Sequence, residues 1–281
     1  MNYFTMCMNN NLLNHLFGKK NDDNTNEGII LETVIDDGVI LETEVTPEQQ
    51  DEESETEITP ELHEEDEIKE TNIVILLDNG HARSTPGKRG PFFSDGSRFF
   101  EWEFNRDVVA RIARGLDKLK IKYHVLVPET EEDVPLPERA RRANEYCKKY
   151  GTKNCFFISV HSNAYGDGIH WENKAGGWEV YTTVGVTKSD DYAKIIYGVA
   201  EEMLKPYGFK CRNGKGHKSG NPGPDYEENF TVIYKTWCPA ILTENLFFTN
   251  EKESTFLMTN EGRQLMADIH IEGIRRIIKN L

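Results

Sequence analysis

The sequence predicts an α/β domain with a twisted, mostly parallel sheet and helices on both faces, a three-layer fold, preceded by an acidic N-terminal tail. Short apolar runs alternate with amphipathic segments through the last 210 residues or so, a pattern typical of parallel sheets. Charge separates the two parts. Residues 1–70 hold 20 acidic and 3 basic residues, whereas the remainder is close to neutral.

The domain boundary is predicted near residue 71. Residues 47–71 are dominated by acidic side chains and hold few large apolar groups, so they cannot bury enough surface to offset the entropy of ordering. We therefore expect residues 1–71 to form a flexible tail and residues 72–281 to form the folded domain, which holds all of the candidate site residues described below. A ten-residue repeat within 28–46 fits either a hairpin or a duplicated linker segment, and we favour the linker.

Composition excludes several classes of protein. Lys and Arg form no basic stripe, so we expect no nucleic-acid partner. No apolar run is long enough for a membrane span, and the N-terminus lacks a basic segment followed by an apolar one. We therefore expect synthesis in the cytoplasm without a signal peptide. The five cysteines form no CxxC pair, and Cys155 and Cys238 beside apolar runs are predicted to be buried thiols.

The elements follow from periodicity and from breaker residues. Phe104, Val108, Ile112 and Leu116 recur every four residues and so define one apolar helix face. Strands are predicted at 73–77, 123–127, 155–160, 178–181 and 240–243. Helices are predicted at 103–119, 138–150, 190–204 and 261–279, the last one preceded by a segment 251–258. Gly and Pro predict loops at 82–98, 164–177 and 208–229, while 230–234 fits an edge strand or a short helix.

Three of the predicted strands deliver a chemically active side chain at the same end. The run before Asp78 leads through a tight turn to His81, the run 156–160 ends in His161, and the run 240–243 ends in Glu244. Open α/β sheets bind ligands in the crevice outside the carboxyl ends of their strands. We therefore expect these three side chains to lie together at one edge of the sheet.

Two histidines and a carboxylate are a typical ligand set for catalytic zinc, which leaves one position open for water. The third ligand is predicted from the start of the first helix, where Glu101 and Glu103 both qualify, depending on the helix phase. Glu244 would then be free for proton transfer, because a glutamate beside a metal site can accept a proton from water and pass it on.

Several ordered motifs of residues 72–281 resemble the zinc-dependent N-acetylmuramoyl-L-alanine amidases of the amidase_3 type. The turn before His81 is similar to the Asp-Pro-Gly-His turn of that family, and Glu101 with Asn105 is similar to its Glu-x-x-x-Asn helix start. The other matching stretches are Leu136–Arg139 with Ala143 and Asn144, Ser159–Ala164, Gly177–Tyr181, Pro239–Glu244 and Phe247–Asn250.

The resemblance implies that His81, Glu101 and His161 bind Zn²⁺, which selects Glu101 over Glu103, and that Glu244 is the general base. It also implies the substrate, peptidoglycan, and the bond cleaved, the amide between N-acetylmuramic acid and L-alanine. Asn79 stands where the family usually has proline, and Asn245 stands where a small residue is common.

Two other functions remain open from the sequence. The domain could be another zinc amide hydrolase or peptidase, or a catalytically inactive module that binds the cell wall. The absence of a predicted signal fits an enzyme that is made in the cytoplasm and released to the wall, as phage endolysins are, with a host remodelling enzyme as the competing setting. The sequence makes no prediction about oligomeric state, and the acidic tail could bind a partner or restrain activity.

Overall fold

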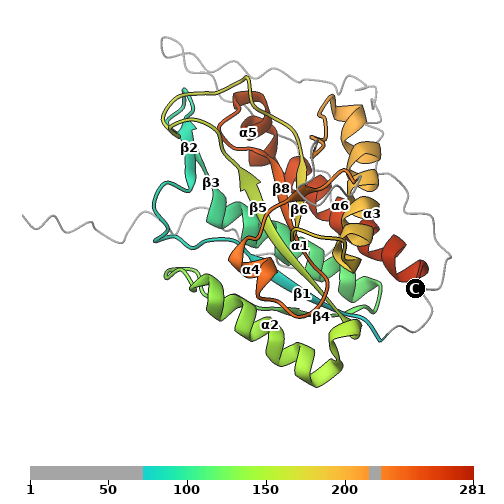
Figure 1. The fold of residues 1–281 in the computed structure, drawn as a ribbon. Helices are drawn as coiled ribbons and strands as arrows, with labels where there is room; N and C mark the ends of the chain where they lie inside the picture. Colours follow the sequence, from blue (N-terminus) through green and yellow to red (C-terminus); the bar gives the residue numbers. More distant parts are fainter. Residues whose placement is uncertain (1–71, 215–222) are drawn as a thin grey trace, which may run out of the picture. The chain divides into compact units, whose positions relative to one another are not determined.

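The computed structural model describes residues 72–214 and 223–281. Six strands form one sheet in the order β4-β1-β5-β8-β6-β7 (Figure 1). These strands are β1 (Val74–Asn79), β4 (Lys122–Val125), β5 (Cys155–Asn163), β6 (Glu179–Thr182), β7 (Tyr226–Glu227) and β8 (Ala240–Phe247). All neighbouring pairs are parallel except β6 and β8. The prediction of a mostly parallel sheet is confirmed.

Helices cover both faces of this sheet, as predicted. They are α1 (Glu101–Lys118), α2 (Leu136–Tyr150), α3 (Lys188–Leu204), α4 (Thr231–Tyr234), α5 (Glu251–Met258) and α6 (Asn260–Lys279), with single 3-10 turns at Thr152–Asn154 and Lys205–Tyr207. Alternate residues of β1 point to opposite faces. Ile75 and Leu77 pack in a core with α1, α3 and α6, whereas Val74 and Leu76 pack in a second core with α2 and α4. Burial on both faces explains why the strands are continuous apolar runs.

The sequence-based boundaries differ from the structure at several places. The stretch 82–98 is not a plain loop, because β2 (Arg89–Phe92) and β3 (Arg98–Phe100) form an antiparallel hairpin at its end. Helix α1 begins two residues earlier than predicted, and residues 230–234 form the short helix α4 rather than an edge strand. Strands β5 and β8 run three and four residues beyond the predicted ends, so His161 and Glu244 lie within strands.

Some predictions concern residues outside the described ranges. These are the acidic tail, its repeat at 28–46 and part of the loop 208–229. Within the described residues, no helix is long and apolar enough to cross a membrane. Cys155 and Cys238 are buried free thiols, as predicted.

Candidate active site

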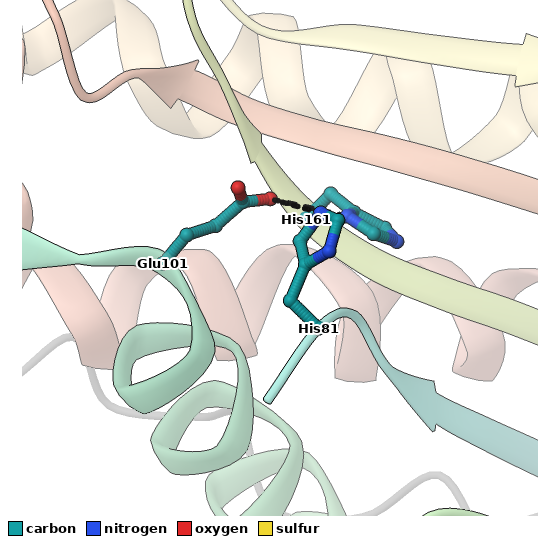
Figure 2. A group of neighbouring side chains, drawn as sticks. All are labelled: His81, Glu101 and His161. Atoms are coloured by element: carbon teal, nitrogen blue, oxygen red, sulfur yellow. Dashed lines mark hydrogen bonds and ion pairs between the residues drawn. The ribbon is translucent and has the colours of Figure 1, made fainter. Parts of the chain in front are cut away.

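The structure brings His81, Glu101 and His161 together at the carboxyl edge of the sheet (Figure 2). Glu101 Oε1 lies 3.1 Å from His161 Nδ1 and 3.5 Å from His81 Nε2. The two imidazole rings meet edge to face with centroids 4.9 Å apart. One potential ligand atom from each residue lies within 4.8 Å of the others, so the three side chains form a single cluster.

The turn after β1 places His81 and leaves room for His161. Gly80 continues the pairing with β5, since its N–H donates to Val160 O at 3.1 Å. A Cβ atom on Gly80 would collide with the imidazole of His161, so only glycine permits this close approach. His81 itself has φ of 63°, an uncommon left-handed conformation for a residue other than glycine. Such strain is typical of functional sites, where the surrounding structure holds it.

Helix α1 delivers Glu101 from its first turn, directly after β3. Asn105 lies one turn further on the same helix face and donates from Nδ2 to Gly80 O at 3.0 Å. The Glu-x-x-x-Asn spacing therefore couples one cluster residue to the turn that carries another. Glu103 points elsewhere, because its Oε1 accepts from Arg263 of α6 at 3.3 Å. The structure thus brings Glu101, and not Glu103, into the cluster.

A buried ion pair supports the same turn from the other face of the sheet. Arg139 of α2 donates from Nη1 to Asp78 Oδ1 at 2.7 Å and to Asn79 O at 2.8 Å. Both charged side chains are 1% exposed. Ser159 of β5 donates to the second oxygen of Asp78 at 2.6 Å. Both buried charges are therefore paired and hydrogen-bonded. Three hydrogen bonds, two from Arg139 and one from Ser159, hold Asp78 and Asn79 in place before the turn.

Electrostatics favour the unprotonated forms of two cluster residues. Burial alone would raise the pKa of Glu101, but the hydrogen bond from His161 and the nearby cations lower it to about 2. Lys88 of the loop before β2 is one of these cations, with Nζ 3.7 Å from Glu101 Oε2. Burial lowers the pKa of His81 to about 4, against the opposing effect of Glu101. A carboxylate beside a neutral imidazole suits a metal ion.

Glu244 lies beside this cluster, because it pairs with His161 in the register of β5 and β8. Its Oε2 atom is shielded from solvent and has no hydrogen-bond partner within the described residues. Burial, followed by the charge of Glu101, raises the pKa of Glu244 well above its ordinary value. On its other side Glu244 pairs with Glu179 of β6. A carboxyl group with high proton affinity therefore faces the cluster.

Aromatic and histidine side chains of the predicted loop 164–177, and of the residue before β6, lie apart from the cluster. Trp178 is fully buried and donates to Asn245 Oδ1 at 2.9 Å, so it belongs to the core. Trp171 packs on Phe93 of the hairpin, with ring centroids 4.9 Å apart. His170 is exposed and bonds to Asp167, three residues earlier. His217 and Lys218 of the predicted loop 208–229 lie outside the described residues.

Sequence reasoning missed several charged residues at the site. Lys88 and Asp133 come from loops, and Asp133 Oδ2 lies 3.8 Å from His81 Nδ1. Glu179 is 1% exposed and contacts Arg212, which is 33 residues away in the chain. A weak signal exists only for Glu179, since an acid in a strand beside Trp178 and Val180 is unusual. Loop cations and acids carry no such signal.

The fold and the cluster define the domain as an α/β enzyme with histidine and carboxylate side chains gathered at the carboxyl edge of its sheet. The chain belongs to the Amidase_3 family of N-acetylmuramoyl-L-alanine amidases, whose family model matches residues 75–276. The resemblance predicted from the motifs is therefore confirmed.

Similar proteins agree with this assignment. The endolysin of Bacillus phage SPP1 is 29% identical over 212 residues, covering 73% of this chain and 66% of that protein. The N-acetylmuramoyl-L-alanine amidase CwlM of Bacillus licheniformis is 30% identical over 206 residues, covering 73% and 68%. The chain thus spans about two thirds of the length of these relatives. The catalytic domain of CwlV from Bacillus (Paenibacillus) polymyxa var. colistinus shares the fold, with a TM-score of 0.57 at 20% identity over 74% of this chain and 98% of that one.

Proposed function

We propose that the domain hydrolyses the amide bond between N-acetylmuramic acid and L-alanine in peptidoglycan, with zinc held by His81, Glu101 and His161. Membership of the amidase family supports the bond and the substrate. The observation that carries the chemistry is the convergence of these three side chains, with Glu244 beside them in register.

The residues of the cluster fit a zinc ion. Zinc takes histidine nitrogen and carboxylate oxygen at about 2.0–2.2 Å, which places tetrahedral ligand atoms about 3.4 Å apart. Two of the three separations, 3.1 Å and 3.5 Å around Glu101 Oε1, are of this size, and all three ligand atoms lie within 4.8 Å of one another. Glu101 Oε2 is also buried without a hydrogen-bond partner within the described residues, so the carboxylate has capacity for a further ligand. When bound, zinc would supply Lewis-acid polarisation of the scissile carbonyl and a lowered pKa for an attacking water.

The chain's own groups account for proton transfer. Glu244 is the group placed to accept the proton of the attacking water, because it pairs in register with His161 and its Oε2 atom has no hydrogen-bond partner within the described residues. The same carboxyl group then donates this proton to the leaving nitrogen of L-alanine. His81 and His161 take no part in this proton transfer and are held by the turn after β1 and by β5. Arg139 keeps the turn in place through Asp78 and takes no proton.

Digestion of purified peptidoglycan with mass spectrometry of the products tests this function. We expect glycan products with intact N-acetylmuramic acid carboxyl groups and stem peptides that begin with L-alanine. Chelation should abolish turnover, added zinc should restore it, and elemental analysis should find about one zinc per chain. Cleavage at another amide would indicate a different zinc amide hydrolase. Wall binding without turnover, unchanged in Glu244→Gln, would indicate an inactive binding module.

We propose a lytic setting, in which the enzyme is made in the cytoplasm and acts on the wall after release. The similarity to a protein named endolysin, from Bacillus phage SPP1, supports this setting, while the similarity to CwlM of Bacillus licheniformis keeps host remodelling as the competing one. Expression of the chain alone in bacteria tests it. Recovery from the periplasm with a processed N-terminus would contradict it.

We also propose that residues 72–281 form the complete catalytic unit and that residues 1–71 act as a separate tail. The family match begins at residue 75, which supports this division. A chain that starts at residue 71 should keep the full turnover on soluble muropeptides. A large gain or loss of turnover would instead show that the tail regulates the site.

A further inference from the structure

Arg212 is held rigidly at the edge of the site, on the segment that leads away from α3. Its N–H donates to Trp178 O at 2.8 Å, and Trp178 N–H donates to Lys210 O at 2.9 Å, so the segment is tied to the start of β6. The Arg212 side chain crosses Gly177, where an added Cβ would lie 2.8 Å from Arg212 Cγ. Gly177 also has φ of 116°, a conformation that favours glycine. The backbone conformation at Gly177 and the hydrogen bonds of Arg212 and Trp178 therefore determine where the Arg212 side chain lies.

The guanidinium group is only partly used by the protein. One nitrogen, Nη1, contacts the buried carboxylate of Glu179. The group lies 5.2 Å from the ring centroid of Phe247, and the Arg212 side chain is 43% exposed. A guanidinium carries five N–H donors. Within residues 72–214 and 223–281, Glu179 is the only hydrogen-bond or ion-pair partner of this side chain, which leaves donors for a ligand.

Glu179 has other hydrogen-bond donors besides Arg212. Its Oε2 atom also accepts from Asn163 Nδ2 at 2.9 Å and from Tyr181 OH at 2.7 Å. Two neutral donors and one guanidinium nitrogen thus satisfy a carboxylate that is 1% exposed. The remaining N–H donors of Arg212 are therefore not needed to satisfy Glu179.

The place of Arg212 relative to Glu244 follows from the strand pairing. Glu179 and Glu244 are directly opposite each other in the antiparallel pair of β6 and β8. Side chains at such positions share a face, with Cβ atoms about 4.5–5.5 Å apart. The guanidinium of Arg212 therefore lies one carboxylate beyond Glu244, the group that we propose transfers the proton at the scissile amide.

We propose that Arg212 binds the free α-carboxylate of the second residue of the stem peptide. This inference rests on the proposed amidase function. The lactyl carboxyl of muramic acid is consumed in the scissile amide, so an acid can come only from the peptide side. One extended residue spans at most about 3.6 Å, so the residue after L-alanine brings the nearest carboxylate. Guanidinium binds carboxylates through paired, charge-assisted hydrogen bonds, which a carboxamide cannot match.

Two soluble muropeptides that differ in one group test this site. Both carry N-acetylmuramoyl-L-alanine followed by D-glutamate, with the α-carboxylate free in one and amidated in the other. The wild type should have a kcat/KM roughly 10- to 100-fold higher on the free acid, the size of a hydrogen bond to a charged group. Arg212→Gln should lose this preference and retain turnover on the amidated substrate. Lys210→Gln, which removes a neighbouring exposed cation, should keep the preference.

Each alternative outcome has a distinct meaning. Equal cleavage of both substrates by the wild type would overturn the inference and leave the amidase function standing. An equal loss on both substrates in Arg212→Gln would also overturn it, because the arginine would then serve only to neutralise Glu179. The double variant with Glu179→Gln removes that neutralising role, and its thermal melt checks folding. Cleavage of neither substrate by the wild type would overturn the amidase function and this inference together.

Discussion

Two arginines lie next to buried carboxylates at this edge of the sheet, and they differ in exposure. Arg139 and Asp78, on the β1 and β5 half of the site, are both 1% exposed. On the β8 and β6 half, Glu179 is 1% exposed, whereas Arg212 is 43% exposed. The buried Arg139 donates hydrogen bonds to Asp78, to Asp133 and to two backbone carbonyls. The exposed Arg212 has N–H donors that no group of the described residues accepts.

The difference separates two tasks. Residues of the β1 and β5 half fix the shape of the cluster, because their hydrogen bonds converge on the turn that carries His81. The β8 and β6 half carries Glu244 and Arg212, the two groups that we propose act on the substrate. Substitutions in the first half should therefore change stability and metal affinity, whereas substitutions of Glu244 and Arg212 in the second half should change turnover and specificity.

Glu244→Gln is the strongest test of this separation. We expect turnover to fall by about 10²- to 10⁴-fold, because a carboxamide cannot accept or donate the transferred proton. Zinc content should stay the same, since Glu244 is outside the ligand set that we propose. Steady-state kinetics with elemental analysis measures both. Glu251→Gln, at an exposed acid at the start of α5, is the control, and loss of zinc in Glu244→Gln would show that the two halves are not separable.

Arg139→Met tests the sealed pair. Removing one partner of a buried ion pair leaves an uncompensated charge, so the free energy of unfolding should fall by about 3–5 kcal/mol. Arg141→Met provides the matched control in the same helix, because Arg141 is 58% exposed and its solvent-screened surface pair with Glu138 should contribute little to stability. Urea unfolding measures both variants. Similar losses in the two would mean that burial does not set the strength of the pair.

Glu253 of α5 gives the β8 half a dependence on pH. It is buried and accepts from Phe247 N–H at 2.7 Å, and burial raises its pKa to about 7 from an ordinary 4.5. The folded state therefore binds this proton more tightly than the unfolded state does. The contribution to stability is complete below pH 4.5 and is lost as pH rises through 7, by at most about 3 kcal/mol.

Urea unfolding at several pH values between 5 and 8 checks this sign. The wild type should lose stability over this range relative to Glu253→Gln, which cannot ionise. If the free energy of unfolding changes with pH by the same amount in both proteins, Glu253 keeps an ordinary pKa. Because Glu253 holds the end of β8, the effect is expected on stability and not on metal binding.

The sequence predicted the parts of this site that depend on strand ends. His81, His161 and Glu244 follow apolar runs, and parallel strands bring their carboxyl ends to one edge, so three distant residues were placed together correctly. The phase of α1 was left open by periodicity, because Glu101 and Glu103 are both in its first turn. The motif resemblance selected Glu101, and the structure, in which Glu101 directly follows β3 at the start of α1, brings it into the cluster.

The parts that escaped prediction depend on irregular or antiparallel structure. The β2 and β3 hairpin has no alternating pattern, since residues 89–100 mix arginine, glycine, proline and serine with aromatic side chains. The pairing of Glu179 with Glu244 requires an antiparallel strand inside a sheet that is otherwise mostly parallel. The contact of Arg212 with Glu179 depends further on a glycine that lets the arginine cross the backbone. Such contacts follow from tertiary packing and not from local propensity.

Asp133→Asn is expected to have the smallest effect. It tests whether Asp133 belongs to the β1 and β5 half of the site, which we expect to set the affinity for zinc. The carboxylate faces His81 Nδ1 at 3.8 Å and is held by Thr85 and Arg139. Carboxylates behind a ligating histidine raise its basicity, and their loss typically costs about 10- to 100-fold in metal affinity. Zinc competition with a chelator measures this, with Glu131→Gln at an exposed neighbour as control. Unchanged affinity would confine the supporting network to Arg139 and Asp78, with Asp133 serving only the loop.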